Sequence, residues 1–377
     1  MQHPNQPAEK IAQSTNGQTS LPYSSSSSRT NRRLIGIVAL VLLLVVVGTL
    51  GALALARNTG KSSPAQINIA SLTANAIGTV GFSDDSSGKG HNDVITVAVN
   101  GMLAAPAGYH YDAWLIDSSS SSFVGLGTLK LANGSYTLKY TQTGTNLLGV
   151  GNKVEVTLEQ GKALHPAKQV LLSDTFPSGA FVYVRHLLVS YSSTPGQKGL
   201  LVGLFEQAHT LLNASQLLRT AQNADETRCI AQDILNILEG QHGADYRALS
   251  CNINSSATGN DFGLLGSNGY IALSQSQVSL AASQPDATAS MRAHEKHVSI
   301  ALQDMQNWLP TIQQDALSLL SNPAGSARIA EIVKLADYDF HGVDLNHDGS
   351  IDYVPGEAGA TIAYVHCQYM VAMELTP

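Results

Sequence analysis

The chain has 377 residues, with 21 lysines and arginines against 28 aspartates and glutamates, and a formal net charge of −7. This acidic balance argues against nucleic acid or an anionic lipid surface as a partner, and it suits the binding of cations. Three cysteines, Cys229, Cys251 and Cys367, are too few for a disulfide scaffold. A Cys229–Cys251 bridge that leaves Cys367 over and a set of three buried thiols both remain open.

The N-terminal part of the chain predicts a membrane anchor. Residues 1–33 are rich in Ser, Gln, Asn and Pro and are expected to form a disordered cytoplasmic tail. Residues 34–56 (LIGIVALVLLLVVVGTLGALALA) carry no charge, and about 20 apolar residues suffice for a transmembrane helix. Arginines crowd the leading end of this run, which predicts a single-pass protein of the cell membrane with a cytoplasmic N-terminus and extracytoplasmic C-terminal domains. A cleaved signal peptide is the alternative, because small residues precede Arg57.

The next region, 66–190, alternates apolar and polar residues. The stretch DVITVAVN (93–100) shows the period of two that a half-buried strand requires, and KVEVTLEQ (153–160) repeats it. Between two further alternating runs lies Asn133-Gly134, a strong hairpin signal because both residues accept positive φ. Short strands separated by Gly and Ser turns predict an antiparallel β-sandwich over 66–190.

Four segments of this region carry a family resemblance. YHYDAWLID (109–117), GLGTL (125–129), the Asn-Gly hairpin and VEVTLE (154–159) together resemble the extracytoplasmic C-terminal domain of anti-sigma-K factors (RskA-like), over roughly residues 90–190. The resemblance implies a domain that lies outside the membrane behind one transmembrane helix. Members of that family bind their sigma factor through a cytoplasmic helical domain, whereas the cytoplasmic part here is a short polar segment without a cysteine. The resemblance therefore applies only to the extracytoplasmic domain.

After a linker at 190–199 the apolar period changes to 3.6, which predicts an all-α helical bundle over 198–377. Proline 310 is expected to end or kink the helix that precedes it. The first two helices are expected around the apolar faces at 201–212 and 230–238. Further helices are expected at 269–283, 287–308, 310–321, 325–338 and 358–375. The predicted fold class is thus a single transmembrane helix plus an α+β exterior, in which a sandwich is followed by a bundle.

The helical region contains a faint internal duplication. Residues 233–265 and 331–362 each place an apolar helix, an aromatic-bearing turn, an Asn/Asp-rich loop and a new helix in the same order. We interpret them as two helix-loop-helix units, of which only the second has an acidic loop. No ion is expected in the first.

The acidic loop has the spacing of a calcium site. In EF-hands, loop positions 1, 3, 5, 7 and 9 supply oxygen ligands. The residues at these positions are Asp344, Asn346, Asp348, Ser350 (through its backbone carbonyl) and Asp352. The string DxNxDGxID also resembles the loop of dockerin repeats.

The closing ligand of this loop is displaced. Position 12 is Pro355, which has no side-chain oxygen, so Glu357 is the expected sixth ligand, although it could instead cap the last helix. An Asx-rich surface turn without metal is the alternative interpretation of the whole loop. A calcium site in which one ligand comes from outside the usual loop position is expected to be weak, with a Kd on the order of 0.1–1 mM and a structural role.

No catalytic constellation emerges from the sequence. His294 and His297 in HEKH are three residues apart, whereas a zinc-protease helix needs a spacing of four, so we interpret the pair as a solvated helix face. A bundle could bring His209 near them, but a lone helical histidine is usually packed or exposed.

The sequence therefore predicts a non-catalytic, membrane-anchored extracytoplasmic binding or sensing protein with a structural calcium site, an envelope protein as partner and no nucleic acid. One alternative is a hydrolase-type enzyme whose active site in the helical domain uses residues such as His294 and Asp337. Its mark would be a concave pocket that gathers such side chains with shifted pKa values. The other alternative is an anti-sigma-factor-type transcription regulator, which requires residues 1–33 to bind a sigma factor.

Overall fold

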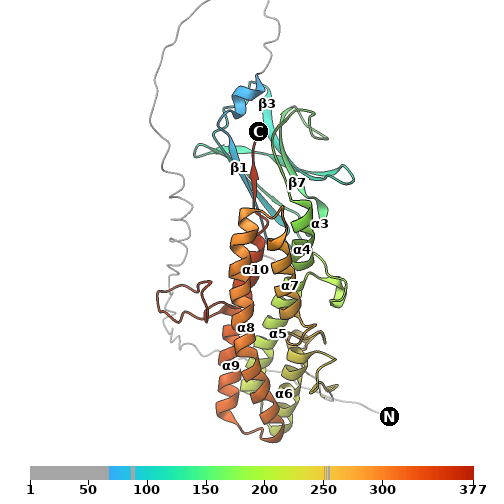
Figure 1. Ribbon diagram of the computed structural model, residues 1–377, viewed down its shortest axis with the longest axis vertical. Coiled ribbons are helices and arrows are strands. Elements are labelled where there is room, and N and C mark those ends of the chain that lie inside the picture. The colour runs from blue at the N-terminus through green and yellow to red at the C-terminus, as the bar shows by residue number, and fades with distance from the viewer. Residues whose placement is uncertain (1–67, 86–89, 250, 252, 254) are drawn as a thin grey trace, which may run out of the picture. The chain divides into compact units, whose positions relative to one another are not determined.

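The computed structural model describes residues 68–85, 90–249, 251, 253 and 255–377. They belong to one compact unit, residues 66–377, in which two β-sheets and a set of long helices adjoin (Figure 1). This unit spans both predicted domains, 66–190 and 198–377. The boundary between those domains stays a prediction.

The membrane-spanning part of the predicted fold class requires a correction. Within the described ranges, no helix is both long and apolar enough to cross a bilayer. The longest described helix, α8 (Ala289–Ser321), buries one face but carries charged residues such as Arg292, Glu295 and Lys296 along its length. The predicted tail (1–33) and the predicted transmembrane segment (34–56) lie outside the described residues. We therefore remove the single transmembrane helix, or signal-anchor, from the fold class and retain two antiparallel sheets with several helices.

Two antiparallel sheets form the β region. The first has the strand order β5-β6-β2-β1-β9 and the second β4-β3-β7-β8. Their inner faces meet where the rings of Tyr111 and Tyr136 pack edge to face, with centroids 5.0 Å apart. The hairpin prediction is confirmed, since Asn133 and Gly134 have φ of 52° and 84° and join β5 to β6. The strand bounds are β1 Ile77–Ser83, β2 Val94–Asn100, β3 Tyr109–Asp117, β4 Ser122–Thr128, β5 Lys130–Ala132, β6 Ser135–Thr141, β7 Lys153–Gln160, β8 Val170–Thr175 and β9 Met373–Leu375.

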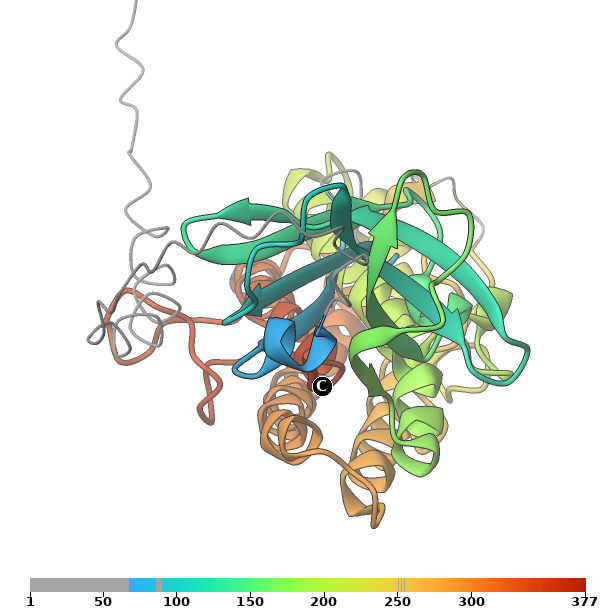
Figure 2. The ribbon, with the colours of Figure 1, turned by 90° about the horizontal axis from the view of Figure 1, so that it is seen from above.

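The end of the chain returns to the sheets, where the sequence predicts helix. The last helix, α10 (Ala360–Tyr369), is shorter than the predicted 358–375. Strand β9 then pairs with β1, and Thr376 bridges to Ser173 of β8. Met373 and Leu375 are buried and Glu374 is exposed, so these residues follow a period of two. Figure 2 shows the two sheets in front of the helices, with the C-terminus beside the strands.

Two helical features of the structure differ from the sequence predictions in another way. Helix α4 lies within the predicted β region because its buried residues, among them Ala180, Val184 and Leu187, follow helical spacing. Of the two expected effects of Pro310, an end or a kink of the helix, the end is wrong, since α8 continues through it with buried Leu309 and Ile312 on either side. The described helices are α2 Ile69–Thr73, α3 Leu147–Val150, α4 Ser178–Leu188, α5 Leu200–Thr220, α6 Ala224–Glu239, α7 Tyr270–Ser283, α8, α9 Ser326–His341 and α10, with 3-10 turns at Pro195–Gln197 and Ser255–Ala257.

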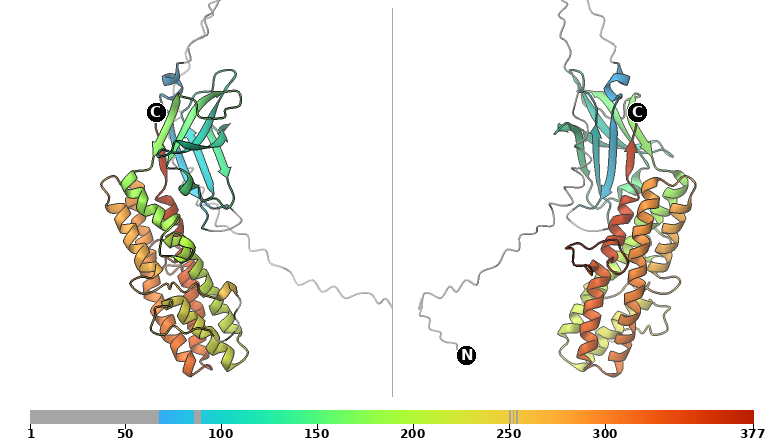
Figure 3. Two further views of the ribbon diagram at one scale, coloured as in Figure 1. Left: turned by 90° about the vertical axis from the view of Figure 1, so that its right-hand side faces the viewer. Right: turned by 60° about the vertical axis from the view of Figure 1, so that its left-hand side comes forward.

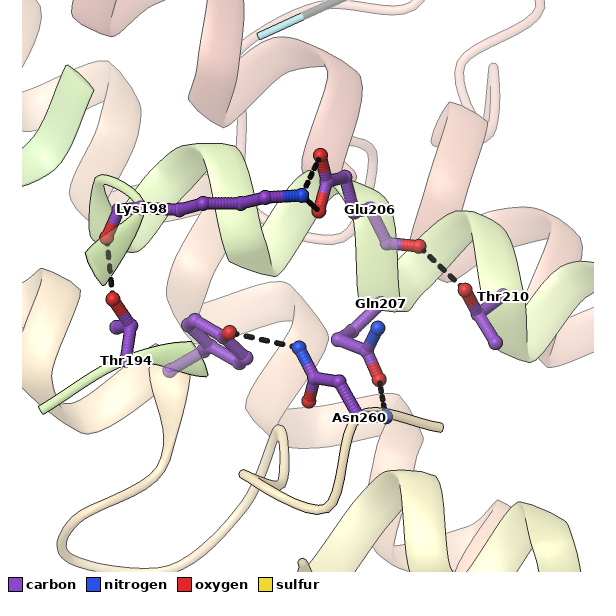
Figure 4. A network of polar contacts seen from close by, with 7 residues as sticks. Thr194, Lys198, Glu206, Gln207, Thr210 and Asn260 are labelled. Atoms are coloured by element: carbon purple, nitrogen blue, oxygen red, sulfur yellow. Dashed lines mark hydrogen bonds and ion pairs between the residues drawn. The ribbon is translucent and has the colours of Figure 1, made fainter. Parts of the chain in front are cut away.

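A polar network holds the α6–α7 connection on α5 (Figure 4). Gln207 of α5 accepts a hydrogen bond from the backbone N–H of Asn260 at 3.0 Å. The Asn260 side chain donates to the hydroxyl of Tyr270, at the start of α7, also at 3.0 Å. Glu206, the residue before Gln207 on α5, pairs with Lys198 at 2.7 Å. The contacts of Gln207 and Asn260 fix the first helix-loop-helix unit against α5.

The two helix-loop-helix units share a backbone arrangement, which supports the predicted duplication. Helices α6 and α9 both end at a glycine with positive φ. The next residue donates a backbone hydrogen bond across the loop in each unit, from Gln241 to the Asp261 carbonyl at 2.8 Å and from Val343 to the Glu357 carbonyl at 2.9 Å. Glu357 of the acidic loop thus corresponds to Asp261 of the first unit.

The cysteine alternatives are resolved. Cys229 of α6 and Cys251 form a disulfide, and Cys367 is a buried free thiol. The bridge links α6 to the connection that follows it.

Candidate metal centre

Three histidines from two helices meet beside the acidic loop. His294 and His297 lie in the second and third turns of α8, three residues apart and hence on one helix face. His366 lies on α10, which runs alongside α8 in the views of Figure 3. The Nδ1 atom of His366 is 2.9 Å from Nδ1 of His294 and 3.0 Å from Nδ1 of His297. We call these three residues the His centre.

Contacts with the sheet region set the orientation of His366. Tyr364 and Gln368 are four residues apart and share one face of α10. The Tyr364 hydroxyl donates to Asp84 at 3.0 Å, and the Gln368 amide donates to Asn92 at 3.0 Å. His366 is two residues from each and therefore faces the other way, towards α8.

Hydrogen bonding alone leaves the His centre poorly satisfied. A neutral imidazole has one N–H and one lone pair. The Nδ1 atom of His366 faces the Nδ1 atoms of both neighbours. A proton on His366 would therefore face two lone pairs, and a proton on one neighbour alone would leave the lone pairs of His366 and the other neighbour in contact. A cation that accepts all three lone pairs suits this arrangement. One ligand atom from each ring lies within 4.8 Å of the other two, a separation that a single ion can bridge.

The surroundings favour the neutral form of each ring. Burial, followed by His297 and His294, lowers the pKa of His366 to about 4. Burial is also the main reason that the pKa values of His294 and His297 lie below the usual value, with smaller contributions from His297 and Lys296, respectively. Neutral imidazole is the form that binds metal, so near neutral pH protons do not compete for these sites.

Aromatic side chains enclose the His centre. The ring of Tyr353, from the acidic loop, stacks on His297 with centroids 3.7 Å apart. Tyr369 lies 5.3 Å from His294 and 5.4 Å from His366, measured between ring centroids. The Ser290 hydroxyl donates to the Tyr369 carbonyl at 2.7 Å and so joins the end of α10 to the start of α8. Such apolar walls limit water access to a metal site.

The predicted calcium ligands form a closed loop between α9 and α10. The Asp344 carboxylate accepts backbone hydrogen bonds from Asp348 at 3.2 Å and Gly349 at 2.9 Å. Asn346 accepts a second one from Asp348, and Asp348 accepts one from Ser350, both at 2.9 Å. Gly349 has a φ of 88°, as the sharp turn at loop position 6 requires.

Glu357 points into this loop, as the sequence predicts. Its side chain is 2 % exposed, and its two oxygens accept the backbone N–H groups of Asn346 and Asp352, each at 3.2 Å. Helix α10 begins after Gly359 without a side-chain cap, so the capping alternative for Glu357 is not what the structure shows. Burial, Asp348, Glu357 and Asp344, in that order, raise the pKa of Asp352. The predicted ligand carboxylates therefore lie close enough to repel one another, and the calcium assignment stays a prediction.

Two other residues singled out from the sequence lie elsewhere. His209 borders a surface hollow of about 450 Å³ with Phe205, Glu206, Phe340 and Thr361. Asp337 contacts His341, one turn later on α9, at 2.9 Å. The structure thus gives His294 two histidine partners and does not give it Asp337.

Sequence reasoning missed His366 as a partner of the histidine pair. The available signal was a pair of histidines on one helix face together with a third histidine on another predicted helix. Because His366 is 69 positions beyond His297, only helix packing brings them together.

Comparisons with family models, curated proteins and solved structures give no match. The function is therefore argued from the site, and the anti-sigma-like resemblance of residues 90–190 stays a prediction.

Proposed function

We propose that this protein is a non-catalytic, extracytoplasmic binding protein whose His centre holds a transition-metal ion of the zinc or copper class. The observation that carries the proposal is the approach of His366 Nδ1 to the Nδ1 atoms of His294 and His297, at 2.9 and 3.0 Å, from helices far apart in the chain. One ligand atom from each of the three rings lies within 4.8 Å of the other two. The Cys229–Cys251 disulfide supports the extracytoplasmic assignment, because such bonds persist in oxidising compartments. The resemblance to the exterior domain of anti-sigma-K factors points to the same compartment, where the partner would be another envelope protein.

The ligand set selects the class of ion. Imidazole nitrogen suits zinc, copper and nickel, whereas calcium and magnesium prefer oxygen. Nitrogens at about 2.0–2.1 Å from a tetrahedral ion are about 3.3 Å apart. The two separations from His366, 2.9 and 3.0 Å, need to open by only a few tenths of an ångström, within the reach of small side-chain rotations. Three protein ligands leave a fourth position for water or an incoming ligand atom.

Binding is proposed in preference to hydrolysis because of what surrounds the three rings. Their described contacts are with one another and with the aromatic rings of Tyr353 and Tyr369. A zinc hydrolase places a general base beside the metal-bound water. Glu295, the carboxylate of HEKH, instead accepts a hydrogen bond from Ser299 at 3.0 Å.

Titration of the metal-free full-length chain with Zn²⁺ and with Co²⁺ tests the proposal. Calorimetry gives the stoichiometry and affinity, and the visible absorption of Co²⁺ reports its coordination geometry. We expect one high-affinity ion per chain, and at least about 100-fold weaker binding in His366→Ala, which loses one of three ligands. The matched control is His209→Ala, a helical histidine outside the His centre. Equal affinity in wild type and His366→Ala would refute the proposal.

A second proposal concerns the acidic loop, which we propose to hold calcium as a structural clamp. The supporting observation is the buried Glu357, whose carboxylate accepts the backbone N–H groups of Asn346 and Asp352. In the proposal, Glu357 replaces the ligand missing at position 12. A Kd of about 0.1 mM would stabilise the fold by about 1.4 kcal/mol at about 1 mM calcium.

A further inference from the structure

We propose that Tyr353 is the lid of the His centre, so that a metal ion enters and leaves only when this side chain swings away. The inference rests on the proposed metal-binding function. It adds how exchange of the ion is controlled and assigns that control to a residue of the acidic loop.

The position of the Tyr353 ring is the first observation. The ring lies nearly parallel to the His297 imidazole, at an interplanar angle of 29° and a centroid distance of 3.7 Å. It also contacts His366 at 4.9 Å, with the planes at 66°. Tyr353 is 43 % exposed. It therefore covers His297 and one side of His366, while part of its own surface is in water.

The backbone around Tyr353 is fixed on both sides. Before it, the Asp352 N–H donates to Glu357. After it, the Gly356 N–H donates to Asp304 at 2.7 Å, and the other oxygen of Asp304 accepts the Ala358 N–H at 3.1 Å. Both acceptor carboxylates are 2 % exposed. The lid is thus a side chain on an anchored segment.

These anchors belong to the same parts of the chain that supply the metal ligands. Asp304 lies on α8, the helix of His294 and His297. Glu357 lies just before α10, the helix of His366. The base of the lid therefore keeps its position relative to the ligands, and rotation of the Tyr353 side chain is the smallest movement that uncovers His297 and His366.

A lid affects rates more than affinity. Loss of the ring removes a barrier that the ion meets in both directions, so the association and dissociation rate constants rise together and their ratio changes little. A ligand or an essential support behaves differently, because its loss raises the dissociation rate constant and the Kd by similar factors.

Metal transfer from the zinc-loaded full-length chain to an excess of a chromophoric chelator, followed by stopped flow, tests the lid. We expect Tyr353→Ala to release Zn²⁺ about tenfold faster than wild type, with the Kd from calorimetry unchanged within about threefold, given the strength of an aromatic stacking contact. Tyr353→Phe keeps the ring and should release zinc at the wild-type rate. Val354→Ala, a truncation of the exposed neighbour in the same segment, is the matched control and should also behave as wild type.

The outcomes separate the lid from the metal site itself. If wild type binds no zinc in calorimetry, the proposed function fails and the lid fails with it. If wild type binds zinc but Tyr353→Ala releases it at the wild-type rate, only the lid is refuted. A release rate and a Kd that rise by the same factor also refute the lid, because Tyr353 would then support the bound state alone.

Discussion

Asp304 accepts a hydrogen bond from the backbone N–H of Gly356 at 2.7 Å, so the helix that carries two of the three histidines also holds the acidic loop. The loop leads directly into α10, which carries the third histidine. Asp304 therefore links the helix of His294 and His297 to the segment that leads into the helix of His366.

We expect Asp304→Asn to destabilise the fold by about 1–3 kcal/mol, because the amide nitrogen would face a backbone N–H and leave one buried donor unsatisfied. Chemical denaturation of the full-length chain measures this free energy of unfolding. The control is Asp315→Asn on the same helix, whose ion pair with Arg328 at 3.6 Å is partly exposed and should be worth less than about 1 kcal/mol. Equal losses in the two variants would contradict the role given to Asp304.

The stability of the metal-free chain should depend on pH through His366. Its pKa in the folded state is about 4, against an ordinary value of 6.5, so the unfolded state binds more protons between these two values. The stability that the chain gains from a neutral His366 is fully present above pH 6.5, the ordinary pKa. It is lost as the pH falls towards the folded-state pKa of about 4. Thermal melts across this range should show a shallower decline for His366→Gln than for wild type. His209→Gln, the control, should show the wild-type dependence of melting temperature on pH. The same wild-type dependence in His366→Gln would contradict the prediction.

Calcium should raise the melting temperature of the full-length chain. A site with a Kd of about 0.1 mM, at about 1 mM calcium, corresponds to a shift on the order of 2–4 °C. Asp348→Ala and Glu357→Gln should abolish the shift, since each removes a predicted ligand. Asp337→Ala removes a carboxylate on α9 that contacts His341 and should leave the shift intact. If calcium does not change the melting temperature of the wild type, the calcium proposal is refuted.

The disulfide should make a measurable contribution to stability. Cys229 and Cys251 are 22 residues apart, and closing a loop of that length corresponds to about 3 kcal/mol in the chain-entropy account. The double variant Cys229→Ser/Cys251→Ser should lose about this much in denaturant unfolding. Peptide mapping without reductant should recover the linked pair and should show Cys367 as a free thiol. Recovery of three free thiols from the oxidised chain would show that the bridge does not form.

Features that depend on neighbouring residues could be predicted from local sequence patterns. The alternation in DVITVAVN specifies β2, and Asn133-Gly134 specifies the turn between β5 and β6, because side-chain period and φ preference act over a few residues. The loop from Asp344 to Glu357 was also predictable in outline, since its turns close through contacts within the segment.

Long-range packing sets which distant segments become neighbours, and no local pattern predicts it. Strand β9 pairs with β1 at the other end of the unit, α8 runs through Pro310 because packing outweighs local preference, and His366 joins His294 across 72 positions. A histidine pair on one helix face has the same local pattern whether it faces water or a third ligand. Whether the pair faces water or a third histidine depends on which helix packs against that face. The packing of the whole unit determines which helix that is.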